Sequence, residues 1–339
     1  MPIDEEVNEE LPFDPLDFDP DEFRREEDEE KEERKFKEGN KQWLISGDKF
    51  YPTGETLKVL PPGYYSIGFD RTISRYYLKK KEIVCEEILK LPDDKFSEII
   101  GDIKKFWNSK ELYVGYKYVY KRGILLHGPP GCGKSSLIHL LGFTLINEYK
   151  GIVINIKDES DIEDFDEIVP IIREIQKDTP VIIIIEDIDN FVNEDRGSAV
   201  TTKLLNILDG NMQVDNMVTI ATTNYPDKLA ERIANRPSRF DRRHEIGLPK
   251  AKVRKYYLES KIPKKEIESN KIDIDQWVKD TKGLTLSHLK EIVLSVLVLG
   301  YSFIDSLKEM TEMNEKKLER KTTKTTSTLG FGNQQSDED

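Results

Sequence analysis

Short apolar runs alternate with helical patterns through the middle of the chain. Runs of consecutive apolar residues, rich in β-branched side chains, are typical of strands buried on both faces of a parallel sheet. Apolar positions three and four apart mark one face of a helix. Strands that alternate with helices predict an α/β domain, a parallel sheet with helices on both faces. The predicted strands are 122–127, 151–156, 181–185 and 217–223, with helices at 137–145 and 168–176 and an acidic surface loop at 158–166.

The pattern changes on both sides of this central domain. Turn residues interrupt short apolar runs over 41–83, which predicts a small β-containing N-terminal module of two to four strands. Helical spacing over 84–110 predicts a linker packed against the central domain, which we bound at 84–250. After Leu248 and Pro249 only helical patterns follow, and they predict a small helical domain over 251–320. Its predicted helices are 253–262, 273–280, 286–299 and 301–320.

Both ends of the chain are strongly polar. Residues 1–34 hold 17 acidic and 4 basic side chains, which accounts for the whole formal net charge of −13. Residues 1–40 bury too little apolar surface to offset the entropy of ordering, so we expect a disordered acidic tail. The spaced Phe13, Phe18 and Phe23 leave a partner-binding peptide as an alternative. Residues 321–339 are rich in Thr, Ser and Lys and then acidic, and they are also predicted to be disordered.

The rest of the chain is electrically balanced, with 48 acidic and 48 basic side chains. It has no overall basic field to attract nucleic acid, although a local basic patch remains open. No apolar run reaches the ~18 residues that span a bilayer, and the acidic N-terminus differs from a signal peptide. Cys85 and Cys132 are the two cysteines, and Cys132 lies within 128–135, a candidate phosphate-binding loop that a disulfide would obstruct, which fits a reducing compartment. We therefore expect a soluble, cytoplasmic protein without a membrane partner.

The first candidate site follows the strand 122–127 and precedes a helix. Residues 128–135 read Gly-Pro-Pro-Gly-Cys-Gly-Lys-Ser and match the phosphate-binding loop G-x-x-x-x-G-K-[ST]. The glycines let the backbone close around a phosphate, Lys134 can reach the β- and γ-phosphates, and the Ser135 hydroxyl can bind Mg²⁺. A simple Gly/Pro turn is the alternative, and the flanking strand and helix count against it. The predicted nucleotide-binding residues are Gly128, Pro129, Pro130, Gly131, Cys132, Gly133, Lys134, Ser135 and Ser136.

Carboxylates follow the strand 181–185. Phosphate-loop enzymes place a Mg²⁺-linked acid and a water-activating acid at this point, and here Glu186 and Asp187 occupy it. A buried strand that emerges at an acidic turn is the plainer interpretation. Asn224 ends the next predicted strand, and parallel strands bring their carboxyl ends to one edge, so we expect it near the pair. Asparagine at a strand end is also common turn chemistry.

A dense arginine cluster lies at 236–243, Arg-Pro-Ser-Arg-Phe-Asp-Arg-Arg. Arginine supplied by a neighbouring subunit can stabilise the charge that develops in phosphoryl transfer. A solvated basic turn, paired with acidic surface residues, explains the residue types equally well.

Taken together, these motifs resemble the AAA ATPases of the AAA+ superfamily over about residues 84–300. Within this family the chain is most similar to the branch of the mitochondrial Rieske-protein translocase. The similarity lies in residues 118–123 and 134–136 and in the Glu-Asp order at 186–187. The chain lacks a counterpart of the membrane anchor of that branch, so its membrane role is not expected here. The other matching motifs are 128–135, Leu-Leu-Asn-Ile-Leu-Asp-Gly at 204–210, Ala-Thr-Thr-Asn at 221–224, and 236–242.

The resemblance implies a role for each site residue. Glu186, with Ser135, takes the Mg²⁺-linked position, Asp187 the catalytic carboxylate and Asn224 the sensor. Arg239 and Arg242 resemble the arginine fingers, which in this family act on the nucleotide of the adjacent subunit. A homo-oligomeric ring follows, usually a hexamer and sometimes a heptamer. The resemblance also implies a helical lid from about residue 251, whose nucleotide-facing helix starts within 283–289. The sequence Asp-Glu-Ser-Asp at 158–161 departs from the aromatic pore motif of peptide-threading members.

The resemblance implies an ATPase that uses ATP and Mg²⁺ and acts as a ring motor or chaperone on a macromolecule, with protein favoured. Two alternatives remain. One is a nucleic-acid-directed ATPase, such as a loader or replication accessory, which the balanced charge disfavours. The other is a nucleotide-gated scaffold with incidental turnover. A single-domain nucleotide kinase would not need the arginine cluster or the helical lid.

Overall fold

The computed structural model describes residues 42–46, 49–53, 56–71, 74–82, 89–192, 199–209, 215–229 and 239–327. By internal contacts the chain divides into two compact units, 1–60 and 61–339. The first contains an antiparallel hairpin of β1 (Gln42–Ser46) and β2 (Lys49–Thr53). The predicted tail at 1–40 lies outside the described residues, as does the end of the chain from residue 328.

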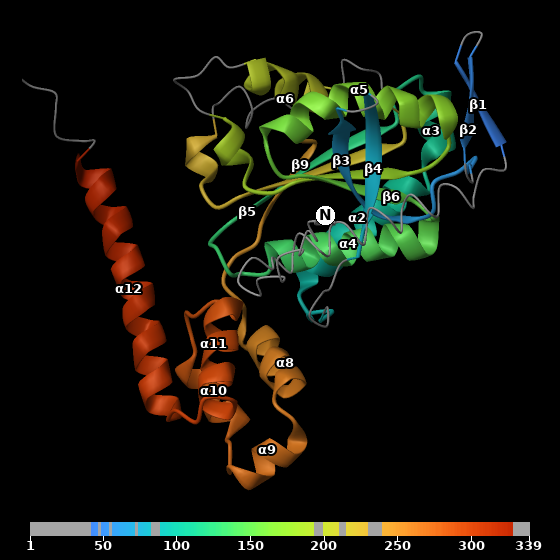
Figure 1. The fold of residues 1–339 in the computed structure, drawn as a ribbon. Coiled ribbons are helices and arrows are strands. Elements are labelled where there is room, and N and C mark those ends of the chain that lie inside the picture. Colours follow the sequence, from blue (N-terminus) through green and yellow to red (C-terminus); the bar gives the residue numbers. More distant parts are fainter. Residues whose placement is uncertain are drawn as a thin grey trace, which may run out of the picture. The chain divides into compact units, whose positions relative to one another are not determined.

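The second unit is built on a seven-stranded sheet in the order β4-β3-β6-β7-β8-β5-β9 (Figure 1). Every neighbouring pair is parallel except β3 and β4, which form an antiparallel hairpin at one edge. The predicted parallel sheet is therefore confirmed. The strands are β3 (Gly63–Asp70), β4 (Arg75–Lys81), β5 (Lys121–His127), β6 (Ile152–Ile156), β7 (Val181–Ile185), β8 (Met217–Thr223) and β9 (Arg242–Glu245).

The centre of this sheet is buried on both faces. All five residues of β7 and all seven of β8 are buried, because helices cover each side. In Figure 1, α5 (Glu159–Ile175) and α6 (Ala199–Asp209) lie on one face, while α2 (Asp94–Trp107) and α4 (Lys134–Tyr149) lie on the other. A continuous β-branched strand suits this position, since each buried aliphatic side chain contributes about 1.5–3 kcal/mol.

The prediction of a surface loop over 158–166 is wrong, because α5 begins at Glu159. Asp158 caps the helix by accepting a hydrogen bond from the backbone N–H of Asp161 at 3.1 Å. Ile162 and Phe165 are buried on one face of the helix. Acidic residues in a first helical turn interact favourably with the helix dipole. The acidic composition that indicated a loop is thus the composition of a helix start.

The predicted module over 41–83 also needs correction. The hairpin of β3 and β4 belongs to the main sheet, and the boundary between the compact units falls after Leu60. Tyr64 explains why, since its side chain is buried and its hydroxyl donates a hydrogen bond to the carbonyl of His139 in α4 at 3.1 Å. Because β3 pairs with β6, these strands extend the sheet and do not form a separate module.

Helices make up the remainder of the second unit. Phe106 in α2 stacks on the buried Tyr120 just before β5, with ring centroids 4.4 Å apart, so the predicted linker packs against the sheet domain. The C-terminal helices match the predicted pattern, with α9 as an unpredicted addition and α12 running past the expected end. These helices are α3 (Lys110–Gly115), α8 (Ala251–Lys261), α9 (Lys264–Ser269), α10 (Ile274–Asp280), α11 (Leu286–Leu297) and α12 (Phe303–Ser327).

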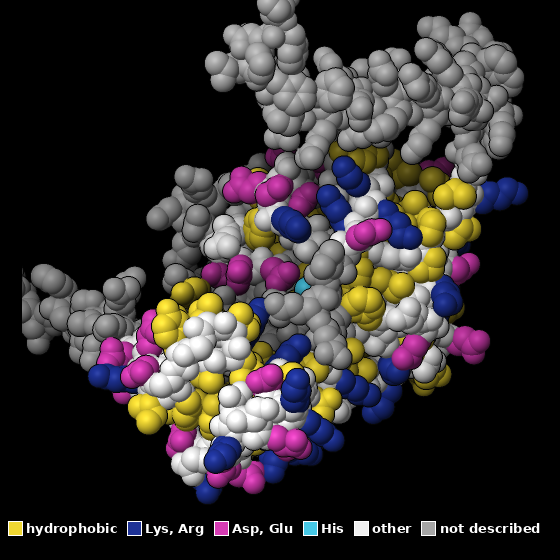
Figure 2. Space-filling view, turned by 60° about the horizontal axis from the view of Figure 1, so that its bottom comes forward, with side chains coloured by type: hydrophobic (Ala, Val, Ile, Leu, Met, Phe, Trp, Pro, Cys, Tyr) yellow, Lys and Arg dark blue, Asp and Glu magenta, His cyan; other side chains and the backbone are white. Residues whose placement is uncertain are grey.

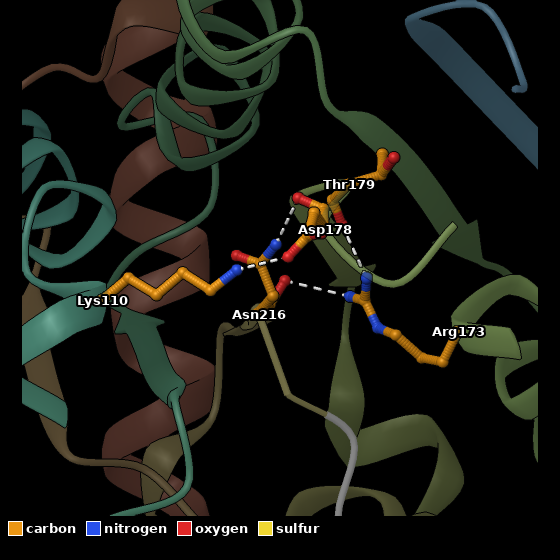
Figure 3. Close-up of polar contacts among 5 residues, drawn as sticks. All are labelled: Lys110, Arg173, Asp178, Thr179 and Asn216. Carbon is orange, nitrogen blue, oxygen red and sulfur yellow. Dashed lines mark hydrogen bonds and ion pairs between the residues drawn. The ribbon is translucent and has the colours of Figure 1, made fainter. Parts of the chain in front are cut away.

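A polar cluster ties the amino ends of β7 and β8 together (Figure 3). Arg173, near the end of α5, donates hydrogen bonds to the carbonyls of Thr179 at 2.6 Å and Asn216 at 3.0 Å. The Asn216 side chain donates to the carbonyl of Asp178, whose carboxylate pairs with Lys110. Burial lowers the pKa of Arg173 to about 10, so it remains charged at neutral pH. This cluster braces the sheet edge opposite the carboxyl ends of the strands.

Candidate functional site

The phosphate loop joins the end of β5 to the start of α4. Gly131 has φ 82° and Gly133, the residue before the helix, has φ 100°, a left-handed backbone that favours glycine. The first N–H groups of a helix have no partner within the helix, and together with the helix dipole they attract an anion. The expected order of strand, loop and helix is therefore present in the structure.

Lys134 lies at the centre of the loop, and its side chain is directed back over it. Its Nζ donates hydrogen bonds to the carbonyl oxygens of Gly128 at 2.8 Å and Pro129 at 3.0 Å, and to Oδ1 of Asn224 at 2.7 Å. The residue is 7% exposed. A buried ammonium needs such oxygen partners, and their geometry holds it beside the backbone that would wrap a phosphate.

Asn224 joins Lys134 to Asp187. While its Oδ1 accepts from Lys134, its Nδ2 donates to Oδ1 of Asp187 at 2.9 Å. The two residues follow the adjacent parallel strands β8 and β7, so the expected proximity of strand ends is found. A cation, an amide and a carboxylate thus form one hydrogen-bonded series at the carboxyl edge of the sheet.

The environment of Asp187 raises the pKa of its carboxyl group. Burial is the largest cause, the charges of Asp189 and Glu186 add to it, and Lys134 acts in the opposite direction. Asp187 has φ 49°, and its backbone N–H donates to the Thr222 hydroxyl at 3.0 Å. A carboxylate with a raised pKa is a better proton acceptor near neutral pH, which suits a general base.

Ser135 and Glu186 form a second pair beside this series. The Ser135 hydroxyl donates a hydrogen bond to Oε2 of Glu186 at 2.7 Å. Hydroxyl and carboxylate oxygens are ligands that Mg²⁺ accepts, and Mg²⁺ usually keeps several waters and substrate phosphates with only one or two protein carboxylates. Within the described residues no group of three His, Cys, Asp or Glu side chains could hold a metal. The pair therefore fits a Mg²⁺ ion that arrives with a nucleotide.

The start of α11 contacts the phosphate loop. The backbone N–H of Ser287 donates to the carbonyl of Gly131 at 3.2 Å, and a Cβ at Gly133 would lie 3.2 Å from Leu286. Thr285 caps the helix, accepting from the backbone N–H of His288 at 3.3 Å, in a capping box with the His288 side chain. The helical domain therefore meets the loop directly, at the helix start that the resemblance placed within 283–289.

The two candidate arginines lie away from the hydrogen-bonded series, on the segment that leads into β9. Arg242 begins that strand and is exposed, opposite Ile124 of β5. Arg239 is only 4% exposed. Residues 230–238, which include Arg236, lie outside the described part. The structure thus separates two arginines that the sequence motif treats alike.

Two threonines at the end of β8 make contacts that the sequence motifs do not predict. Thr222 accepts the backbone N–H of Asp187, and the Thr223 hydroxyl donates to Oδ1 of Asp189 at 2.6 Å. Their hydroxyls tie β8 to the acidic turn after β7. The available signal was the pair of hydroxyl residues directly before Asn224, at the strand edge where the carboxylates were expected.

Comparison with known proteins gives matches across this region. Residues 124–248 match the model of the ATPase family associated with various cellular activities (AAA). The chain is 36% identical over 152 residues to the ATPase family gene 2 protein of Saccharomyces cerevisiae, covering 39% of this chain and 18% of that protein. It is 27% identical over 237 residues to the cell division cycle protein 48 homolog of Archaeoglobus fulgidus, covering 63% and 32%.

A further relative is the ATP-dependent zinc metalloprotease FtsH 2 of Thermoanaerobacter sp. It is 26% identical over 257 residues, which cover 72% of this chain and 48% of the metalloprotease. The chain thus spans less than half the length of each of these three relatives.

Proposed function

Because residues 124–248 form an ATPase domain of the AAA family, we propose that this protein couples hydrolysis of ATP to the remodelling of a protein substrate. The family resemblance that the motifs indicated is confirmed, while the Rieske-protein translocase branch stays a prediction. The series Lys134–Asn224–Asp187 is the observation that carries the proposal, because it joins a phosphate-binding cation to a carboxylate of raised pKa.

In the proposed reaction, water attacks the γ-phosphorus and the bond to the ADP oxygen breaks. Asp187 accepts a proton from that water, and Asn224 holds the carboxylate in place. Lys134 stabilises negative charge on the phosphates, since positioning and electrostatics supply most of the catalysis in phosphoryl transfer. Ser135 and Glu186 would hold Mg²⁺, which neutralises phosphate charge when bound.

The position of Arg242 supports the proposal of an oligomer. This residue lies opposite Ile124, four residues before Gly128, and a strand rises about 3.3 Å per residue, so its backbone is about 13 Å along β5 from its own phosphate loop. An exposed arginine at that distance is better placed for the nucleotide of a neighbouring subunit. A homo-oligomeric ring, hexameric as the resemblance implies, would let each subunit supply Arg242 to the next.

The contact between α11 and the phosphate loop supplies a means of coupling. Occupation of the loop by phosphate would alter the backbone around Gly131, and the Ser287 bond would pass that change to the helical domain. Domain movements of this kind proceed by hinge or shear of packed elements. In a ring, movement of the helical domain would displace the adjacent subunit. Hydrolysis would in this way drive the remodelling of a substrate.

A protein substrate is favoured over nucleic acid. The names of the relatives include a metalloprotease, an enzyme class that acts on proteins. On the face shown in Figure 2, Lys and Arg side chains are interspersed with Asp and Glu, in keeping with the balanced charge outside the acidic tail. Such a face lacks the concentration of positive charge that binds the phosphate backbone of a nucleic acid. None of the described helices has the length and apolar character of a membrane span.

A substrate-trapping experiment tests the proposal. Asp187→Asn should bind ATP and hydrolyse it slowly, so partners captured with this variant in ATP should be released in ADP. Lys134→Ala, which lacks the phosphate-binding ammonium, should capture none of them, and Asp275→Ala on the helical domain is a matched surface control. Capture that is the same in ATP, in ADP and with Lys134→Ala would contradict a nucleotide-driven remodelling function.

A further inference from the structure

The arginine-bearing segment 239–242 is attached to the beginning of β5 by a side-chain hydrogen bond. The backbone N–H of Gly123 donates to Oδ2 of Asp241 at 2.7 Å, across 118 positions of the sequence. The same glycine admits the segment closely, because a Cβ at this position would overlap the carbonyl oxygen of Arg239. The hydrogen bond from its N–H and the absence of a Cβ therefore both allow Gly123 to hold segment 239–242 against β5.

Two anchoring residues, Phe240 and Asp241, lie between the two arginines, and the exposed Arg242 follows them. Phe240 is 3% exposed and packs into the core, with its Cα 3.2 Å from where a Cβ of Gly123 would be. Asp241 then fixes the backbone, and the next residue, Arg242, is exposed at the start of β9. The Asp241 carboxylate thus fixes the backbone directly before Arg242, the arginine that is exposed and available to a neighbouring subunit.

We propose that Asp241 is a positioning residue for hydrolysis in the neighbouring subunit, a role that rests on the proposed function. Its carboxylate locks the segment onto β5, and this sets where Arg242 reaches the adjacent nucleotide. The strand β5 leads into the subunit's own phosphate loop at its carboxyl end, and Arg242 lies on the neighbouring strand β9, opposite Ile124 in the middle of β5. Asp241 acts through Arg242 and does not itself contact the nucleotide.

Removal of the carboxylate should slow turnover without weakening nucleotide binding by the same subunit. Misplacement of a reacting group by about 1 Å can cost about 100-fold in rate, so Asp241→Ala should lower kcat between about tenfold and about 100-fold. Binding of a fluorescent ATP analogue should be unchanged. Asp241→Asn keeps an acceptor oxygen for the Gly123 N–H and should turn over close to the wild-type rate, as should the control Asp275→Ala.

A mixing experiment separates positioning across subunits from a general structural role. Asp241→Ala keeps an intact pocket with a misplaced arginine, whereas Lys134→Ala has a disabled pocket with a well-placed arginine. In mixed assemblies the second variant should complete the pocket of the first. Turnover of the mixture should therefore exceed the sum of the two variants measured separately.

The matched mixture of Arg242→Ala with Lys134→Ala distinguishes the possible failures. If that mixture exceeds the sum of its parts and the Asp241→Ala mixture does not, Asp241 does not position Arg242 and the inference is overturned. If neither mixture exceeds its sum, arginine supply across subunits fails, and both the ring mechanism and this inference fall.

Gly123→Ala provides a second variant in case Asp241→Ala does not fold. Its added methyl group would overlap the carbonyl oxygen of Arg239 and so displace the segment, while Asp241 is left intact. It should reproduce the loss of turnover and the rescue by Lys134→Ala. Loss of turnover without rescue, in a variant that still binds the fluorescent analogue, would overturn the inference.

Discussion

The side-chain Nδ2 of Asn224 donates a hydrogen bond of 2.9 Å to Oδ1 of Asp187, although the residues are 37 positions apart. The other side of the same amide accepts from Lys134. This single amide therefore fixes the distance between the cation of the phosphate loop and the proposed general base.

Asn224→Ala should lower kcat more than it weakens ATP binding. Lys134 keeps its two carbonyl partners, whereas Asp187 loses the amide that orients it. Loss of an orienting group in phosphoryl transfer should cost about ten- to 100-fold in kcat. Steady-state ATPase assays alongside analogue binding would measure both effects. A variant that loses binding and turnover in equal proportion would contradict the orienting role.

Turnover should fall at acidic pH as Asp187 takes up a proton. Its pKa is raised, so the loss should begin at a higher pH than for an ordinary aspartate. A pH profile of kcat would show an acidic limb, and this limb should shift when Glu186 or Asp189 is neutralised, because their charges contribute to the raised pKa. An unchanged limb in both variants would exclude Asp187 as its source.

Asp187→Asn should also make the fold slightly more stable at neutral pH. A raised pKa means that the folded state binds the proton more readily than the unfolded state, so the ionised carboxylate destabilises the fold above that pKa. Below the pKa of the unfolded chain both states are protonated, and the difference between wild type and variant should vanish. Thermal unfolding without nucleotide at neutral and acidic pH would measure this. A variant less stable at neutral pH would contradict it.

Ser135→Ala should raise the Mg²⁺ concentration needed for half-maximal turnover. Glu186 loses the hydroxyl at 2.7 Å, and the metal would lose one of its two proposed protein ligands. Mg²⁺ titration of the ATPase rate would measure the shift. Thr144→Ala, further along α4, is the matched control and should titrate as the wild type does, because its hydroxyl donates only to the carbonyl of Leu140 within the helix. Equal shifts in the two variants would argue for a general defect of the helix and its loop.

Ile183→Ala should destabilise the domain without a specific effect on the site. Its side chain is fully buried at the centre of β7, and truncation of an isoleucine in a packed core typically costs about 2–5 kcal/mol. Chemical denaturation would measure the change, with the exposed Ile175→Ala as the control. A change of similar size in both variants would contradict the central position of β7.

The amino-acid sequence by itself determined the central strands, the phosphate loop and the identity of the carboxylates and the asparagine. These signals are local, because a buried strand such as 181–185 needs consecutive β-branched residues and a phosphate loop needs glycines at set positions. The predicted proximity of Asn224 to Asp187 also followed, since parallel strands end at one edge.

Only the tertiary structure decided which faces and partners these elements take. The strand Gly63–Asp70 reads as part of a separate module until its pairing with β6 is known, because pairing between distant segments leaves no local pattern. The acidic start of α5 looks like a loop until Ile162 and Phe165 are seen to be buried. Arg239 and Arg242 differ for the same reason, since burial depends on the segment's docking against Gly123, and that contact joins residues more than 100 positions apart.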